Sequence, residues 1–284
     1  MRKLIVNCDD LGISECVNEA IFDCHVNGVV TSATLMANMP AAESAAQECR
    51  AFKELGIGVH LNLTLGYPVS KPDDIPLLLS PEGCFYSNKE MPKLLKYPNR
   101  LVYRQVYKEL DSQVKKCRRL GVPITHLDSH HHICRMPIAM FAMADVAREN
   151  GIRAVRSIRG CYNKEIVQQL IFNPKRLIAE SGHAVNHYLF RSFFKLNTPD
   201  CKAAPNILPL EKRRNLSDAY VALVNLLPRG IAEIAFHPGG VGAYSGDTNA
   251  MAQRRVEEYT LAKSASLKSA INAAGIELIH FGNL

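Results

Sequence analysis

Apolar, β-branched runs alternate with amphipathic stretches along most of this chain. Residues 3–8 (KLIVNC) have the pattern of a strand, and residues 15–28 follow with apolar positions at helical spacing and a terminal glycine. The same pairing recurs. Further strands are predicted at 31–38, 57–64, 124–128, 153–158, 231–238 and 276–281, and further helices at 40–55, 101–120, 137–150, 215–227 and 251–273. Strands that alternate with helices, without hairpin turns between them, predict a mainly parallel sheet.

The number of strand–helix units distinguishes two parallel architectures. About seven units favour a closed or nearly closed (β/α) barrel over an open doubly wound sheet. No GxGxxG motif follows the first strand, so the dinucleotide-binding form of the open sheet loses its main support. The predicted fold class is therefore α/β, a barrel of mainly parallel strands. Two irregular excursions interrupt it, one at 66–100, where six prolines fall, and one at 160–212.

Charge and hydropathy exclude several classes of protein. The net charge is +7, and nine Lys/Arg oppose four Asp/Glu between Gly160 and Asn215, but no basic stripe is interleaved with aromatic residues. We therefore expect a locally basic, solvated surface and no nucleic-acid partner. No apolar run approaches the ~18 residues of a membrane span. The start, MRKLIVNCDDLG, has too short an apolar run for a signal peptide, so we expect a first strand and a cytoplasmic protein.

The cysteines show no pattern of a metal ribbon or of a disulfide framework. The nine of them are scattered along the chain, odd in number and free of CxxC pairs. Thiols of a cytosolic protein are kept reduced by the glutathione and thioredoxin systems. We therefore expect all nine cysteines to be reduced.

Titratable residues lie within or just after the carboxyl-terminal parts of the predicted strands. They are Asp9 and Asp10, His60, Asp128 with His130–His132, Arg156, and His237. In parallel α/β proteins, functional sites gather just beyond the carboxyl ends of the strands. Each residue has a structural alternative when taken alone, because Asp is a common helix cap and a single histidine in a strand is often a core residue. Their joint position at one rim favours a functional site.

The run HLDSHHH, residues 126–132, cannot supply three ligands from three adjacent histidines. In an extended segment, neighbouring side chains point to opposite sides, so only alternate members can share a metal. His130 lies nearest the strand end and is the simplest single ligand, whereas His126, inside the strand, is expected to be buried structure. Asp10, His60 and His130 would make a three-ligand site with positions left for water and substrate. His131 and His132 would then hydrogen-bond ligands or substrate.

Asp9, beside such a site, predicts hydrolytic chemistry. A metal ion polarises a carbonyl and lowers the pKa of its water, and a free carboxylate can remove the proton of that water. His237 would protonate the leaving amine or alkoxide from the other side. Two adjacent carboxylates thus take different roles, Asp10 as a ligand and Asp9 as the base.

Five ordered motifs carry a family resemblance. VNCDDLG, GVVTSATLM, GVHLNLT, THLDSHHH and FHPG together resemble the YdjC-like carbohydrate deacetylase family, which includes chitooligosaccharide deacetylases and HpnK-like proteins. The resemblance covers nearly the whole chain. It implies one domain over 1–284, folded as a distorted (β/α) barrel of the polysaccharide-deacetylase type. It also implies metal-dependent removal of N-acetyl groups from small sugars.

Carried over by motif, the resemblance implies the same roles. Asp10, His60 and His130 would be the metal ligands, Asp9 the base and His237 the acid. The implied substrate-binding residues are Arg156, His132 and Asp128. The family's divalent ion is usually given as Mg²⁺, but two imidazoles favour Zn²⁺ or another transition metal. Cys134 stands where many relatives have a further histidine.

Two other functions stay open at this point. The first is metal-dependent hydrolysis of another amide, ester or phosphoester, for example in a lipid-linked glycan. The second is a non-catalytic carbohydrate-binding barrel, which would have no need of the acid–base pair Asp9 and His237. A homodimer is compatible with either.

Overall fold

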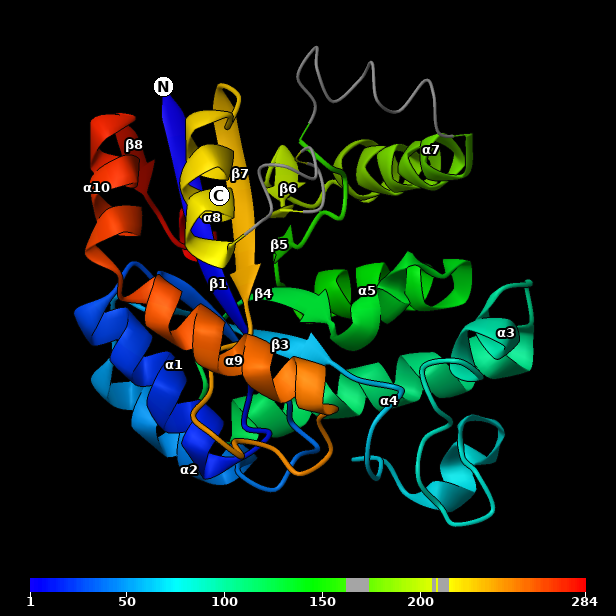
Figure 1. Ribbon diagram of the computed structural model, residues 1–284. Coiled ribbons are helices and arrows are strands. Elements are labelled where there is room, and N and C mark those ends of the chain that lie inside the picture. Colours follow the sequence, from blue (N-terminus) through cyan, green and yellow to red (C-terminus); the bar gives the residue numbers. More distant parts are fainter. Residues whose placement is uncertain (162–173, 206–207, 209–214) are drawn as a thin grey trace.

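One sheet of eight parallel strands forms the centre of the molecule (Figure 1). The computed structural model describes residues 1–161, 174–205, 208 and 215–284. The strand order is β5-β4-β3-β2-β1-β7-β6, and β8 pairs with the start of β1. The strands are β1 (Arg2–Leu11), β2 (Ser32–Leu35), β3 (Gly56–Leu61), β4 (Ile124–Ser129), β5 (Ala154–Val155), β6 (Cys201–Ala203), β7 (Gly230–Phe236) and β8 (Ile276–Leu278). The predicted α/β class with parallel strands is confirmed.

The sheet curls until its two edges approach each other. Isolated parallel bridges join Ala154 to Asn197 and Gly160 to Lys202, so the segments that carry β5 and β6 meet. A disulfide between Cys161 and Cys201 lies at the same seam. The expectation that all nine cysteines are reduced is therefore wrong for this pair, because chain folding brings together two cysteines 40 residues apart. The other seven are free.

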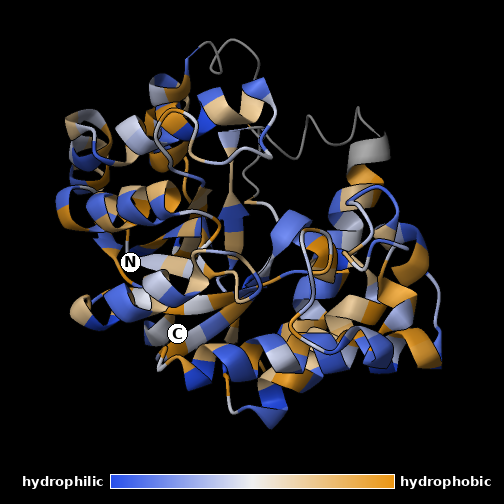
Figure 2. Ribbon diagram, turned by 90° about the horizontal axis from the view of Figure 1, so that it is seen from below, coloured by the Kyte–Doolittle hydropathy of each residue, from blue (hydrophilic) through white to orange (hydrophobic). Residues whose placement is uncertain are grey.

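Helices cover the outside of the curled sheet (Figure 1). Those described are α1 (Glu15–Asn27), α2 (Ala42–Glu48), α3 (Met91–Leu95), α4 (Arg100–Arg119), α5 (Pro137–Glu149), α7 (Pro174–Tyr188), α8 (Leu216–Asn225), α9 (Asn249–Ala262) and α10 (Ala265–Ala273). In Figure 2, most of them carry an apolar and a polar side. No helix in the described part of the chain has the length and apolarity needed to cross a membrane.

Three predicted elements differ from those observed. The single helix expected at 251–273 is two helices, because the Ser264 hydroxyl accepts a hydrogen bond from the Leu267 N–H and starts α10. The helix expected at 40–55 ends at Glu48 and continues as one 3-10 turn. The irregular excursion at 160–212 contains α7 and β6, and its residues 162–173, 206–207 and 209–212 lie outside the described part.

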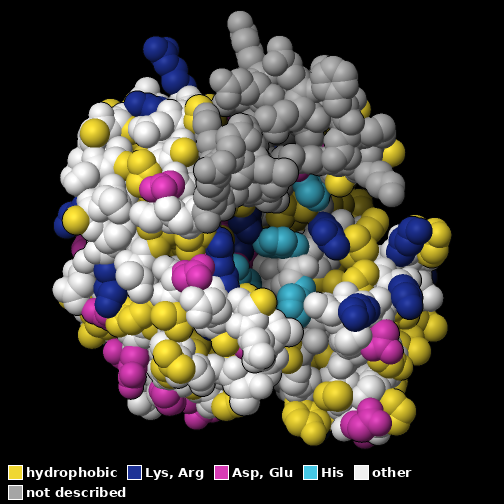
Figure 3. Space-filling model, viewed as in Figure 1, with side chains coloured by type: hydrophobic (Ala, Val, Ile, Leu, Met, Phe, Trp, Pro, Cys, Tyr) yellow, Lys and Arg dark blue, Asp and Glu magenta, His cyan; other side chains and the backbone are white. Residues whose placement is uncertain are grey.

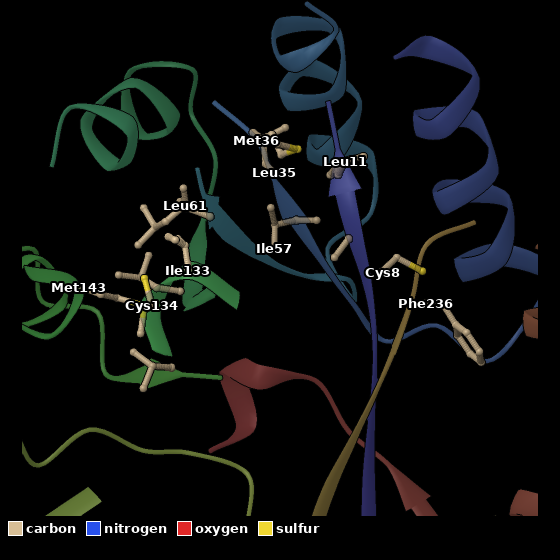
Figure 4. Close-up of a cluster of buried hydrophobic side chains, with 14 of the residues drawn as sticks. Cys8, Leu11, Leu35, Met36, Ile57, Leu61, Ile133, Cys134, Met143 and Phe236 are labelled. Carbon is tan, nitrogen blue, oxygen red and sulfur yellow. The ribbon is translucent and has the colours of Figure 1, made fainter. Parts of the chain in front are cut away.

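Residues alternate along each strand between the helix side and the barrel interior. On β1, Leu4, Val6 and Cys8 belong to the main hydrophobic core, whereas Ile5 belongs to a small cluster with Ala154, Ile279 and Phe281. The main core lies between sheet and helices, where Leu11, Leu35, Ile57 and Leu61 gather with Met143 (Figure 4).

The interior of the barrel is apolar at one level and polar at the next. The small cluster containing Ile5 and Phe281 lies near the strand starts. The ring of His126 stacks on Phe281 with centroids 3.7 Å apart and is fully buried, which confirms the expected structural position of this histidine. The next inward positions are Asn7, Asp9 and Asp128. The alternation thus directs polar side chains to the carboxyl ends of the strands.

We predict that Gly58→Ala destabilises the fold. A Cβ at Gly58 would come within 2.5 Å of the His126 ring, which is confined by Phe281. Overpacking of this kind costs about 1–3 kcal/mol in the free energy of unfolding. Denaturant unfolding would measure it, with Gly182→Ala as the control, since a Cβ there meets nothing within 4 Å. An equal effect of both substitutions would contradict the packing argument.

Candidate active site

The predicted site residues come together at the carboxyl end of the sheet. A cavity of about 1540 Å³ opens there, lined by Asp9, Asp10, His60, His237 and the histidines at 130–132, among others. Figure 3 shows histidine side chains gathered in this hollow, with Lys and Arg side chains close by. Residues from four strand ends therefore meet at one cavity.

Asp10, His60 and His130 face one another. Nδ1 of His130 lies 3.1 Å from Oδ1 of Asp10, and Nε2 of His60 lies 3.5 Å from the same oxygen. All three side chains are buried. They belong to β1, to β3 and to the turn that follows β4. One ligand atom of each lies within 4.8 Å of the others, so these residues can hold a metal ion.

His60 is held in place from the side away from Asp10. Its Nδ1 lies 2.6 Å from Oδ1 of Asp128 and 3.1 Å from the Thr34 hydroxyl. When Nδ1–H is donated to Asp128, Nε2 keeps its lone pair for a ligand, as in most histidine metal sites. Asp128 is buried behind His60 and does not line the cavity. The structure thus places this residue behind a candidate ligand and outside the lining of the cavity.

The three consecutive histidines point to three different partners. His131 and His132 both have a φ of 51°, in the left-handed region, so the chain turns sharply after His130. His130 contacts Asp10, Nδ1 of His131 lies 3.0 Å from Thr64 Oγ1, and Nε2 of His132 lies 3.2 Å from Lys202 Nζ. Only His130 of the three therefore faces both Asp10 and His60.

Asp9 is held by the buried arginine Arg156. The Nη1 and Nη2 groups of Arg156 donate to the two carboxylate oxygens of Asp9 at 2.7 and 2.6 Å. The same guanidinium contacts Asp128 and Glu233 at 2.7 Å each. Burial raises the pKa of Asp9, but the charge and hydrogen bonds of Arg156, together with the charges of His60 and His237, hold this pKa well below its usual range. Arg156 itself does not line the cavity but lies beneath Asp9.

His237 lies between two carboxylates. Its Nε2 is 3.6 Å from Oδ2 of Asp9, and its Nδ1 is 3.4 Å from Oε2 of Glu258. The backbone N–H of His237 also donates to Glu258 at 2.5 Å. Burial would lower the pKa of His237, but the hydrogen bond to Glu258 and the charge of Asp9 raise it overall. The arrangement favours a protonated imidazolium beside an ionised Asp9.

A second group of possible ligands, Asp9, His60 and Asp128, is already paired internally. Both oxygens of Asp9 accept from Arg156, and Asp128 accepts from His60 and from Arg156. A metal ion there would have to displace a buried guanidinium from its carboxylates, which is costly. The first group, with Asp10 and His130, is the better candidate for a metal site.

Several residues of the site were not predicted from the sequence. They are Lys202, Glu233, Arg255 and Glu258. Glu233 left a signal, a lone acid within the apolar strand IAEIAF, whereas Arg255 and Glu258 lie among other charged residues of α9 with no distinguishing spacing. Lys202 belongs to the unpredicted strand β6. Burial and then the Arg156 charge lower the pKa of Lys202 to about 8.

Fold and site together define a parallel β/α barrel with an Asp-His-His cluster at its carboxyl end. The YdjC-like protein family matches residues 3–273, so the chain belongs to this family. A carbohydrate deacetylase of Geobacillus stearothermophilus is 30% identical over 99% of this chain and 97% of its own length. A carbohydrate deacetylase of Clostridium beijerinckii is 29% identical over 99% of this chain and 100% of its own.

A solved structure shows the same fold. It belongs to an Enterococcus faecalis V583 protein named for cellobiose-phosphate cleavage, and it matches with a TM-score of 0.80 at 24% identity over 99% of this chain and 98% of that chain. The distorted (β/α) barrel and the YdjC-like family expected from the sequence motifs are confirmed.

We predict that Arg156→Met strongly destabilises the metal-free protein at neutral pH. It leaves three buried carboxylates without their cation, and breaking a buried ion pair costs about 3–5 kcal/mol. In the wild type, Arg156 keeps the pKa values of Asp9 and Asp128 lowered, so both carboxylates stay ionised from neutral pH to about pH 4. In the variant, burial without this cation raises their pKa values, so the carboxylates take up protons and lose the cost of a buried charge as pH falls. The difference in the free energy of unfolding between wild type and variant should therefore become smaller towards pH 4.

Denaturant unfolding with a chelator at both pH values would measure this effect. Arg148→Met, which removes an exposed arginine 3.5 Å from Asp145, is the control and should change the free energy by less than about 1 kcal/mol. A deficit that is the same at both pH values would show that Arg156 stabilises by packing alone.

Proposed function

We propose that this protein is a metal-dependent hydrolase that removes N-acetyl groups from small sugars, such as chitooligosaccharides. The observation that carries the proposal is the juxtaposition of an Asp-His-His cluster with a separate carboxylate–imidazole pair. Asp9 and His237 are 3.6 Å apart and border the same cavity as Asp10, His60 and His130. Membership of the YdjC-like family and two full-length carbohydrate deacetylase relatives support the choice of substrate.

The metal would be held by Asp10, His60 and His130. A carboxylate with two imidazoles suits Zn²⁺ or another transition metal, and Mg²⁺ ordinarily takes oxygen ligands. A divalent ion bound there supplies a Lewis acid that polarises the acetyl carbonyl and acidifies a water molecule. Three protein ligands leave positions for both.

Asp9 would take a proton from the attacking water. Its pKa lies well below the usual range, so it is ionised and can accept the proton, but the Arg156 contact also makes it a weak base. Removal of the proton therefore depends on the acidity of the water as well as on Asp9. Arg156 keeps the carboxylate oriented while the proton is transferred.

His237 would donate a proton to the departing amine. Attack of the water oxygen on the acetyl carbon forms a C–O bond, and the C–N bond then breaks as the imidazolium proton moves to nitrogen. The products are acetate and a free amino sugar. Glu258, within 3.4 Å of Nδ1, favours the protonated imidazole that this step requires.

A single screen tests the proposed function. Protein purified without chelator is analysed for bound metals, then assayed for acetate release from di-N-acetylchitobiose with Zn²⁺, Co²⁺, Ni²⁺ or Mg²⁺. We expect release that a chelator abolishes and added metal restores. Acetylated lipids and phosphoesters serve as comparison substrates. Turnover only of these substrates, or tight sugar binding without any acetate release, would contradict the proposal.

We predict that two variants separate metal binding from proton transfer. His130→Ala should lose both bound metal and activity, because it removes a ligand. Asp9→Asn should keep the metal while kcat falls by about 10²–10⁴-fold, the usual contribution of general acid–base catalysis. Metal content by mass spectrometry and acetate release would be measured together. Undiminished acetate release by Asp9→Asn would rule out Asp9 as the base.

A further inference from the structure

Arg255 contacts the candidate ligand Asp10 from a helix whose sequence gives no sign of a connection with the site. It lies on α9, and its side chain is 2% exposed. We infer that Arg255 is a positioning residue. It holds one carboxylate oxygen of Asp10, so that only the other oxygen faces the two histidines. This inference rests on the proposed function in that it takes Asp10 to be a metal ligand.

The two oxygens of Asp10 have separate partners. Nη2 of Arg255 donates to Oδ2 at 2.8 Å, while Oδ1 lies 3.1 Å from Nδ1 of His130 and 3.5 Å from Nε2 of His60. With Oδ2 engaged, Asp10 would offer a metal ion only Oδ1. The ion would then keep coordination positions for water and for the acetyl carbonyl.

Asp10 is a residue that needs external restraint. Its φ of 68° lies in the left-handed region, which an aspartate adopts at a cost of order 1–2 kcal/mol. A conformation of this kind persists where surrounding contacts enforce it. The backbone turn is closed locally by the hydrogen bond from the Ile13 N–H to the Asp10 carbonyl at 3.1 Å. The Arg255 contact fixes the side chain that projects from this turn.

Arg255 is itself anchored. Its Nε donates to Asp247 at 2.5 Å, in the segment between β7 and α9, and its backbone carbonyl accepts from the Gly239 N–H at 3.3 Å. The Asp247 carboxylate offsets the guanidinium charge, which limits its repulsion of a nearby metal cation. Orientation of Asp10 is therefore the dominant effect of Arg255 on metal binding. Three residues further along α9, Glu258 contacts His237, so one helix supports both the candidate ligand and the candidate acid.

The test is the affinity for divalent ions of the wild type, Arg255→Met and Arg255→Lys, measured with Zn²⁺ and Co²⁺ by chelator competition. We expect Arg255→Met to bind about 10–100-fold more weakly, the usual effect of removing a group that orients a ligand. The affinity of Arg255→Lys should lie between those of the wild type and Arg255→Met, because a lysine ammonium lacks the forked guanidinium that contacts Asp10 and Asp247 together. The visible spectrum of the Co²⁺ protein should also change in Arg255→Met, where Oδ2 becomes available as a second donor.

Two controls separate positioning from a merely structural effect. Arg148→Met removes an exposed arginine far from Asp10 in the sequence and should leave the affinity unchanged. The double variant Arg255→Met/Asp247→Asn removes the carboxylate that the single variant leaves unpaired. If positioning is the cause, the double variant should bind divalent ions as weakly as the single variant. Recovery of wild-type affinity would overturn the inference. Circular dichroism and metal-free thermal unfolding establish that each variant is folded.

The outcomes distinguish this inference from the proposed function. A wild type that binds none of the divalent ions contradicts the proposed function. If the wild type binds these ions, and a variant that is folded, Arg255→Met or Arg255→Lys, binds them equally well or more tightly, the positioning role is contradicted but the proposed function is not. If Arg255→Met does not fold, an unchanged affinity and an unchanged Co²⁺ spectrum in Arg255→Lys likewise contradict the positioning role.

Discussion

The guanidinium of Arg156, buried inside the barrel, contacts carboxylates from three strands. Asp9 of β1, Asp128 of β4 and Glu233 of β7 all lie within 2.7 Å of it. Ionised carboxylates inside a protein cost several kcal/mol each unless a cation or hydrogen-bond donors compensate them. Because Arg156 follows β5, one side chain links four strands at the level of the candidate site. The orientation of His60 depends on it through Asp128.

Two neighbouring aspartates have separate environments because each has its own arginine. Asp9 points into the barrel towards Arg156, whereas Asp10, with its left-handed backbone, points to His60 and His130 and is held by Arg255. The pair would otherwise be two like charges in one buried space. The two guanidiniums stabilise both ionised forms and separate a candidate base from a candidate ligand. This division is the physical basis of the proposed hydrolytic chemistry.

Much of the fold could be predicted from local patterns, and the failures have local causes. β-branched runs and helical spacing located seven of the eight strands, but β6, with three residues, is too short to leave a periodic signal. The helix pair α9 and α10 was predicted as one helix because the apolar spacing continues across the Ser264 cap. The disulfide between Cys161 and Cys201 depends on closure of the curled sheet, which no spacing of cysteines indicates.

Local patterns in the chain predict which residues lie at the carboxyl ends of the strands. The period-two alternation of each strand and the parallel order of the sheet are local properties, and they suffice to bring Asp9, Asp10, His60 and His130 to one rim. The partners of these side chains depend on contacts between distant parts of the chain. Arg156 meets Asp9 across 147 residues, and Arg255 meets Asp10 across 245. Pairings over such separations arise from how the sheet curls and where α9 packs, and charged residues in a sequence do not specify which opposite charge they will reach.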